Sequence, residues 1–281
     1  MENLLTDPPS EGPPLQHAAP LVVEDLTAGY GDKTVITGLS FSLREGETLA
    51  LVGSSGCGKS TVLKCLVGLL RPQGGSVRLL GEDLWSMAVE ERRKLLRRVG
   101  LIFQAGALLG SLSVEDNLAL PLEMHTNVPA PTIKRLVKAR LAQVGLAKAA
   151  PLKPSELSGG MRKRVAIARS LMMDPHLLLC DEPTSGLDPV VAASIDELLA
   201  EAKRLGGSSL VLVSHDLASI QRLSDRIIML ADGKEAARGT FEELSADQTP
   251  AVRAFFQREP RTSGYEGPSM AEQFLTQLPR R

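Results

Sequence analysis

Long hydrophobic runs, an excess of charge of one sign and an even set of cysteines are all missing from this chain of 281 residues. No apolar run approaches the roughly 18 residues that a membrane-spanning helix needs. The acidic, proline-rich start lacks the basic and apolar regions of a signal peptide. The sequence therefore predicts a chain that stays in the cytoplasm and takes any membrane part from another subunit.

Basic and acidic side chains nearly balance, at 32 and 33, and leave a net charge of −1. Because binding to nucleic-acid phosphates requires a basic surface, we expect no nucleic-acid partner. The three cysteines, Cys57, Cys65 and Cys180, are an odd number, which suits a reducing compartment. We interpret them as small packing residues, with Cys57 a candidate for alkylation.

A hydrophobic content of 43% is enough for a full core and predicts one α/β domain with a lobe. Residues 1–20 contain five prolines and are predicted to be disordered. Strands and a helix are expected from Leu21 to about Gln104, helices over about 105–164, and alternating strands and helices again over 165–239. The capping pattern of residues 113–116 and the amphipathic residues 133–144 indicate two of the helices.

The strongest motif is GSSGCGKS at residues 53–60, which fits the phosphate-binding loop G-x-x-x-x-G-K-[ST]. An apolar strand at residues 48–52 precedes it and a helix follows from Ser60, as such a loop requires. Backbone N–H groups would cradle phosphates there, and the lysine would reach the terminal ones. The sequence thus predicts ATP binding by a set of residues within and beside the loop: Gly53, Ser54, Ser55, Gly56, Cys57, Gly58, Lys59, Ser60 and Thr61.

Two later strands end in residues suited to phosphate chemistry. The apolar run from His176 leads to Asp181 and Glu182, and the run over 210–214 leads to His215. Asp181 would hold Mg²⁺ together with Ser60, and Glu182 would orient or deprotonate the attacking water. His215 could bond the γ-phosphate and sense its loss. Alone, these would be an acidic loop and a structural histidine, but the phosphate loop favours the catalytic interpretation.

In this order the residues resemble the nucleotide-binding subunit of an ABC transporter, from about Val22 to Gly239. The resemblance implies a P-loop NTPase (RecA-like) core with an ABC β-subdomain and an inserted α-helical subdomain at about 105–164, all within residues 21–240. It implies that Tyr30 stacks on adenine. It also implies that Gln104 touches Mg²⁺, takes part in catalysis and reports to the membrane partner.

The same resemblance makes LSGGM at residues 157–161 the signature loop and SGLD at residues 185–188 the loop that crosses between sites. In this family the signature loop completes the ATP site of the opposite subunit, so a head-to-tail homodimer is expected around two ATP molecules. Ser158, Gly159, Gly160 and Asp188 are then expected to contact nucleotide in the partner chain. We interpret Arg162, Lys163 and Arg164 as a solvated or dimer-facing surface.

Residues 103–112 and 117–122, with Met161 where most relatives have glutamine, resemble the lipid-transport ATPases that work with MCE proteins, including the Mla type. This implies a phospholipid or lipid cargo, permease subunits, an MCE-domain protein, a possible small regulatory subunit, and a place at the cytoplasmic face of the inner membrane. A coupling helix would contact Ala107, Leu108, Leu109 and Leu112, although some of these could be core. An importer for a polar solute is the alternative, because its ATPase would keep every catalytic residue.

Five of the nine aromatic residues fall in residues 241–281, which we interpret as a C-terminal extension that clasps the neighbouring ATPase through Tyr265 and nearby residues. The alternative is a tail that packs on its own domain.

Two other classes of ATPase are excluded. Lys59 and Leu157 stand 98 positions apart, which leaves no room for the coiled coil of a chromosome-maintenance ATPase, and there is no second phosphate loop as in translation factors of this type.

Overall fold

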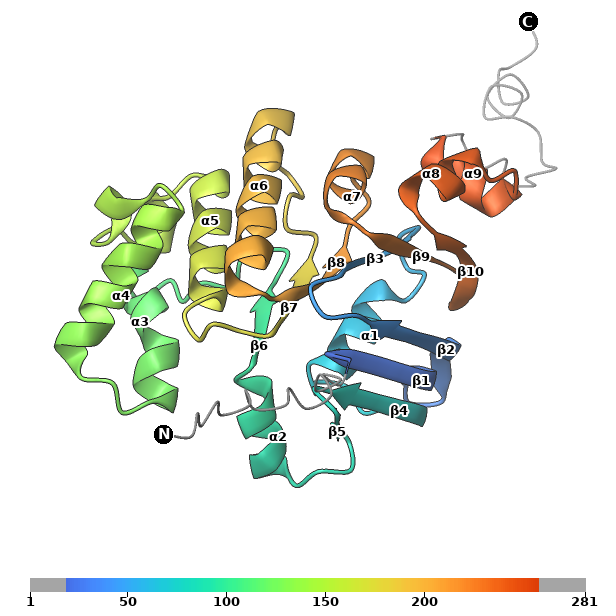
Figure 1. Ribbon diagram of the computed structural model, residues 1–281, viewed down its shortest axis with the longest axis horizontal. Helices are drawn as coiled ribbons and strands as arrows, with labels where there is room; N and C mark the ends of the chain where they lie inside the picture. The colour runs from blue at the N-terminus through green and yellow to red at the C-terminus, as the bar shows by residue number, and fades with distance from the viewer. Residues whose placement is uncertain (1–18, 258–281) are drawn as a thin grey trace, which may run out of the picture.

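The computed structural model describes residues 19–257, in which two sheets stand side by side with helices packed around them (Figure 1). The main sheet has six strands in the order β10 (Lys234–Gly239), β9 (Arg226–Ala231), β3 (Thr48–Gly53), β8 (Ser209–Val213), β7 (Leu177–Asp181) and β6 (Val99–Ile102). The second has four, in the order β2 (Lys33–Leu43), β1 (Leu21–Tyr30), β4 (Gly74–Leu79) and β5 (Glu82–Asp83). The predicted α/β class is confirmed.

The central strands of the main sheet run parallel. β3 pairs in parallel with β8 and β9, and β7 pairs in parallel with β6 and β8. All residues of β3 and β8 are buried, which explains why they are continuous apolar runs and not alternating ones. Because the strands are parallel, their carboxyl ends lie at one edge of the sheet, where a ligand site is expected.

Helix α1 (Lys59–Leu66) follows the phosphate loop and joins the two sheets into one core. Its buried side chains Val62, Leu63 and Leu66 belong to a cluster with inward residues of β1, β2, β3 and β4. The second sheet pairs antiparallel throughout. Helix α2 (Val89–Leu96) then contributes Leu95 to the same cluster before β6. The second sheet therefore packs against α1, the helix that follows the phosphate loop.

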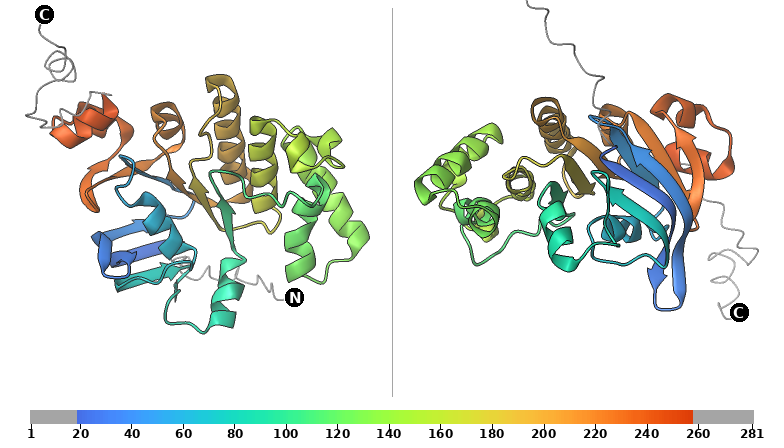
Figure 2. Two further views of the ribbon diagram at one scale, coloured as in Figure 1. Left: turned by 180° about the vertical axis from the view of Figure 1, so that it is seen from behind. Right: turned by 60° about the horizontal axis from the view of Figure 1, so that its bottom comes forward.

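A group of helices forms a separate hydrophobic cluster, at the end of the molecule away from the C-terminal helices (Figure 2). Its side chains come mainly from α3 (Val114–His125), α4 (Ala130–Gln143), the short 3-10 helix η1 (Ala147–Ala149) and α5 (Gly159–Ser170). A second short 3-10 helix, η2 (Pro154–Glu156), precedes α5. Ser113 caps α3 by accepting a hydrogen bond from the Asp116 backbone N–H, so the predicted capping box is confirmed. The predicted amphipathic face of α4 is also confirmed by buried Ile133, Val137 and Leu141.

The remaining helices cover the main sheet. They are α6 (Pro189–Gly206), α7 (Leu217–Leu223), α8 (Phe241–Ala246) and α9 (Pro250–Phe256). Leu244, Val252 and Phe256 of the last two helices are buried against Val52 and Met229. Phe241 and Phe255 pack edge-to-face on Phe256, so three of the five C-terminal aromatics lie on their own domain. Phe274 and the predicted clasp at Tyr265 lie outside the described residues, as do residues 1–18 of the segment 1–20 that is predicted to be disordered. Pro20, at the end of that segment, is instead buried and accepts a hydrogen bond from the Leu80 N–H.

Within residues 19–257, each helix is too short or too polar to cross a membrane.

Candidate nucleotide-binding site

The carboxyl ends of four parallel strands meet at one open cavity of about 730 Å³. β3 ends at the phosphate loop, β6 ends before Gln104, β7 ends at Asp181, and β8 ends before His215. The residues of the prediction that line this cavity are Tyr30, Gly53, Ser54, Ser55, Gly56, Gly58, Lys59, Ser60, Thr61, Gln104, Asp181, Glu182 and His215. Residues up to 185 positions apart in sequence thus face one another across the same space.

Two glycines of the phosphate loop have no substitute. Gly53 has φ 143° and Gly58 has φ 109°, backbone conformations that other residues rarely adopt. A Cβ atom on Gly53 would lie 2.3 Å from the Leu230 carbonyl oxygen, and one on Gly58 would lie 2.3 Å from Cδ1 of Ile36. The loop therefore wraps tightly enough for its N–H groups and the start of α1 to face an anion.

Lys59 lies over the loop in this structure. Its Nζ donates hydrogen bonds to the Gly53 and Ser54 carbonyl oxygens, at 2.8 and 3.0 Å, and lies 3.7 Å from Sγ of Cys57. Cys57 is 5% exposed and lies beneath the loop, so its side chain does not line the cavity, unlike its neighbours. The lysine ammonium is therefore already placed at the site where phosphate charge would arrive.

Tyr30 lines the cavity and is 48% exposed. Nζ of Lys64 donates to the tyrosine hydroxyl at 3.0 Å and lies 5.3 Å from the ring centroid. This hydrogen bond, with one from Thr61, lowers the pKa of the Tyr30 hydroxyl. An exposed aromatic face fixed in this way is suited to stacking on a flat ring.

Glu182 is held in an unusual backbone conformation directly after β7. Its φ is +49°, a region that costs a non-glycine residue on the order of 1–3 kcal/mol. Its backbone N–H donates to the Val213 carbonyl at 2.9 Å, and its side chain is 2.8 Å from Nδ1 of His215. The glutamate side chain is 12% exposed and the histidine side chain 66% exposed. The strained backbone therefore aims a partly desolvated carboxylate into the cavity beside a solvent-facing imidazole.

Ser60, Gln104 and Asp181, which we predict to hold Mg²⁺, all border this cavity. Burial raises the pKa of Asp181, and the charge of Glu182 adds to this, while Lys59 and other lysines oppose it. Within residues 19–257, no cluster of three or more His, Cys, Asp or Glu side chains could hold a metal by itself. One carboxylate with hydroxyl and amide oxygens fits Mg²⁺, which takes its remaining ligands from water and substrate phosphates.

The structure does not bring the four signature-side residues to this cavity. Ser158, Gly159, Gly160 and Asp188 line a different cavity, of about 460 Å³. Ser158 and Asp188 are helix caps here: Ser158 accepts from the Met161 N–H of α5, and Asp188 accepts from the first N–H groups of α6. The predicted ATP contacts of one chain therefore fall into two separate places on its surface.

Lys163 corrects the interpretation of residues 162–164 as a solvated or dimer-facing surface. Lys163 is 7% exposed and donates to the carbonyl oxygens of Gln104 and Glu182. Burial lowers the pKa of this lysine, and the charges of Glu182 and Asp181 oppose that shift. Helical spacing could have predicted this burial from the sequence, because Lys163 stands four positions before Ile167 and so shares the buried face of α5.

Four cavity-lining residues were not predicted: Lys33, Val35, Val213 and Phe255. Lys33 and Val35 lie on β2 and extend the cavity wall beside Tyr30. Val213 is the last residue of β8. Phe255 comes from α9, close to the end of the described chain. The concentration of aromatics after residue 240 was the one sequence signal for it, and it did not indicate the ligand site.

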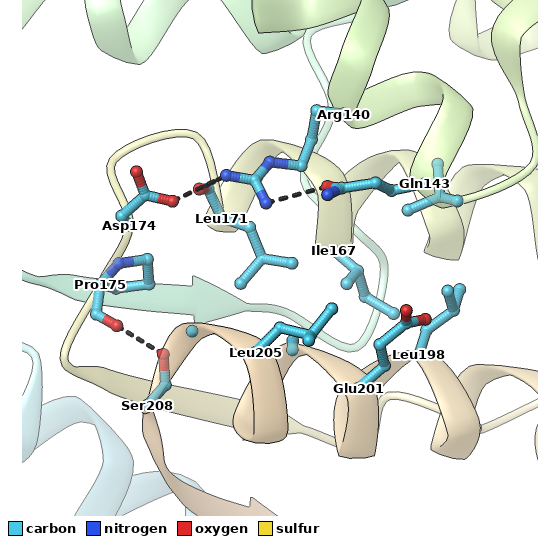
Figure 3. A pocket seen from close by; sticks show the side chains of 13 residues that line it. Arg140, Gln143, Ile167, Leu171, Asp174, Pro175, Leu198, Glu201, Leu205 and Ser208 are labelled. Carbon is cyan, nitrogen blue, oxygen red and sulfur yellow. Dashed lines mark hydrogen bonds and ion pairs between the residues drawn. The ribbon is translucent and has the colours of Figure 1, made fainter.

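A further cavity of about 320 Å³ lies between α4, α5 and α6 (Figure 3). Its wall is mixed, with Leu171, Leu198 and Leu205 beside polar side chains that include Arg140 and Glu201. The guanidinium of Arg140 at its rim already bonds Asp174 and the Leu171 carbonyl, each at 2.8 Å. It has no loop of backbone N–H groups, so it is not suited to a nucleotide.

Comparison with known proteins identifies the family. Residues 36–185 match the family model described as ABC transporter. The chain is 37% identical over 237 residues to the intermembrane phospholipid transport system ATP-binding protein MlaF of Haemophilus influenzae, covering 84% of this chain and 90% of that protein. It is 37% identical over 272 residues to TRIGALACTOSYLDIACYLGLYCEROL 3, a chloroplastic protein of Arabidopsis thaliana, covering 90% of this chain and 77% of that protein.

A solved dimeric ATP-binding cassette, in a post-hydrolysis state with ADP and Pi bound, superimposes with a TM-score of 0.73 and 29% identity. The superposition covers 79% of this chain and 98% of the cassette. The predicted P-loop core of the ABC type and the predicted ATPase activity are confirmed. This chain belongs to the ABC transporter family, as an ATP-binding subunit that hydrolyses ATP.

Proposed function

We propose that this subunit drives phospholipid transport between membranes by binding and hydrolysing ATP. The assignment of a phospholipid cargo rests on 37% identity to a protein named as the ATP-binding protein of an intermembrane phospholipid transport system, of which 90% is covered. Phe103 and Leu109, 37% and 46% exposed, lie in the segment after β6 that resembles the lipid-transport ATPases. A polar-solute importer is the alternative that the experiment below distinguishes.

The geometry of the main cavity supports the proposed catalytic roles. Glu182 would accept a proton from the attacking water, because its carboxylate faces the phosphate loop and is held by His215. Lys59 would exchange its bonds to the loop carbonyls for bonds to the β- and γ-phosphates. Ser60, Asp181 and Gln104 would hold Mg²⁺, whose charge would offset that of the phosphates. Tyr30 would stack on adenine.

The two separate cavities support a head-to-tail dimer. One cavity has a phosphate loop and a water-activating acid, and the other has the N-terminus of α5 behind Ser158 and Gly159. A helix N-terminus favours a negative charge, so the γ-phosphate held by one chain would be gripped by α5 of the other. Hydrolysis would remove that shared group and open the pair. The movement would reach permease subunits, and an MCE-domain protein and a small regulatory subunit would complete the assembly at the cytoplasmic face of the inner membrane.

Co-purification tests the cargo proposal. The full-length chain, tagged and expressed at its native level, would be purified from membranes in mild detergent, and the accompanying proteins and lipids identified by mass spectrometry. We expect a multi-span permease, an MCE-domain protein and enriched phospholipid. A solute-binding protein with a different permease would contradict lipid transport and leave the ATP chemistry unchanged.

A further inference from the structure

The signature helix α5 carries a buried cation that contacts the catalytic centre of its own chain. We propose that Lys163 is a positioning residue, which holds the backbone of Glu182 and the loop of Gln104 in register with the signature loop. This goes beyond the proposed function, in which α5 serves only the ATP site of the partner, and it rests on the assignment of Glu182 to the attacking water.

The Glu182 carbonyl oxygen is the first anchor. It accepts hydrogen bonds from Nζ of Lys163 at 3.0 Å, from Oγ of Ser185 at 2.9 Å and from the Ser185 N–H at 3.2 Å. Nζ of Lys163 also lies 3.4 Å from Oγ of Ser185. Three donors on one carbonyl fix the residue whose φ of +49° would otherwise relax, and the direction of its side chain depends on that backbone.

The Gln104 loop is the second anchor. Nζ of Lys163 donates to the Gln104 carbonyl oxygen, and two turns further along α5 Arg169 donates to the Gly106 and Ala107 carbonyls, at 3.0 and 2.7 Å. The backbone at Gly106 and Ala107 has positive φ, so this loop also depends on outside bonds for its conformation. The helix that begins at the signature loop therefore holds the glutamine loop at both ends.

Burial makes these bonds effective. Lys163 is 7% exposed, so water competes little for its three donors, and its charge lies near the carboxylates of Asp181 and Glu182. Arg162 and Arg164, its neighbours on α5, bond elsewhere: Arg162 to the Leu157 carbonyl, and Arg164 to the Val144 carbonyl and Ser194. Of these three basic residues, Lys163 alone contacts the catalytic loops.

The chemical consequence is a link within one chain between the signature loop and the water-activating acid. When a partner's γ-phosphate docks on the start of α5, any movement of the helix reaches Glu182 through Lys163. Such a residue supports the rate of the chemical step and contributes little to ATP binding, because the phosphate loop and Tyr30 lie outside its contacts.

The test compares Lys163→Met with Lys138→Met, a matched control on the exposed face of α4. Full-length variants are assayed for kcat and KM of ATP hydrolysis and for affinity toward a fluorescent ATP analogue. We expect Lys163→Met to lower kcat about 10²-fold, the effect of a roughly 1 Å misplacement, with ATP affinity unchanged. Lys163→Arg, which keeps the charge and donors, should turn over ATP faster than Lys163→Met. Parental kcat in Lys163→Met would overturn the proposal, as would a loss of ATP affinity without a loss of kcat.

Two further variants keep the test decisive. If Lys163→Met does not fold, Ser185→Ala removes the neighbouring hydroxyl that holds the same carbonyl. A lower kcat at unchanged ATP affinity in Ser185→Ala supports the proposal, and parental kcat overturns it. Glu182→Gln is measured in parallel: normal turnover there would reject the assignment of the base itself, whereas low turnover there with parental Lys163→Met rejects the role of Lys163 alone.

Discussion

At the scale of single residues, the phosphate loop combines two glycines of unusual backbone conformation with one lysine. Gly53 and Gly58 adopt conformations closed to other residues, and this brings the loop carbonyls within reach of Lys59. The ammonium is therefore held in place before any phosphate arrives. Lys59 donates to the Gly53 and Ser54 carbonyl oxygens in this structure, and the ATP phosphates would accept charge-assisted hydrogen bonds from the same ammonium.

Replacing Lys59 with alanine is expected to weaken ATP binding by about 10- to 150-fold. Charge-assisted hydrogen bonds contribute about 1.5–3 kcal/mol each, and the terminal phosphates would lose their nearest cation. Titration with a fluorescent ATP analogue measures the change. Lys148→Ala, an exposed lysine on η1, is the control and should bind as the parent does. Parental affinity in Lys59→Ala would contradict the assigned role.

The three cysteines are expected to differ in reactivity, since they differ in position. Burial raises the pKa of Cys65 to about 11 and that of Cys180 also rises, so both thiols stay protonated and covered at pH 8. Cys57 lies beside Lys59 under the phosphate loop and is 5% exposed, whereas Cys65 and Cys180 are 0% exposed. Maleimide should modify Cys57 first and abolish ATP binding, and Mg²⁺ with ATP should protect it. Peptide mapping by mass spectrometry measures this, with Cys57→Ser as the control. Labelling of Cys180 in the folded protein at the rate of Cys57 would contradict it.

At the scale of elements, the sequence predicted best what local rules determine. The strand before the phosphate loop, the capping box at Ser113 and the buried face of α4 all depend on neighbours in sequence, and all are present. Asp181, Glu182 and His215 could be named in advance because parallel strands bring their carboxyl ends together. The loop residues came from their motif, and Tyr30 and Gln104 from the family resemblance. The side chain of Cys57 is the exception, since it points beneath the loop.

What the sequence could not provide is contact between distant segments. Lys163 follows the signature loop among other basic residues, and charge patterning favours a solvated surface there. Its partners, the carbonyls of Gln104 and Glu182, stand 59 and 19 positions away and carry no side-chain signal. Phe255 is similar: a helix 40 residues after His215 returns to the cavity only because α9 packs on the main sheet.

The two C-terminal helices are expected to be part of the folded domain. Leu244, Val252 and Phe256 are buried against the main sheet, and each such side chain contributes about 1.5–3 kcal/mol. A chain ending at residue 240 should therefore lose most of its stability, whereas one ending at Arg258 should keep the parental Tm. Thermal unfolding followed by circular dichroism distinguishes them, and a parental Tm in the shorter chain would contradict this packing.

The same truncation at Arg258 also tests the proposed clasp. If residues beyond 258 hold the neighbouring ATPase, their removal weakens dimer assembly and transport at unchanged Tm. Unchanged assembly and transport would reject the clasp.

At the scale of the whole molecule, the predicted ATP contacts of the chain line two separate cavities. The main cavity has the phosphate loop, the acids and Tyr30, and the signature cavity has a capped helix N-terminus. Two copies arranged head to tail would complete both, so ATP itself becomes part of the interface. The central claim is that the γ-phosphate joins two chains and that its loss separates them.

The measurement that tests this claim most directly is the mass in solution of the Glu182→Gln variant with ATP and Mg²⁺, by size exclusion with light scattering. Gly159→Asp in the same background is the matched control, because its Cβ would meet nothing closer than 3.6 Å and its carboxylate would repel a partner's γ-phosphate. We predict a dimer of two 30.1 kDa chains for Glu182→Gln with ATP, and monomers with ADP or with the added Gly159→Asp change. A Glu182→Gln monomer that has ATP bound, or a dimer that persists in the double variant, would contradict the account.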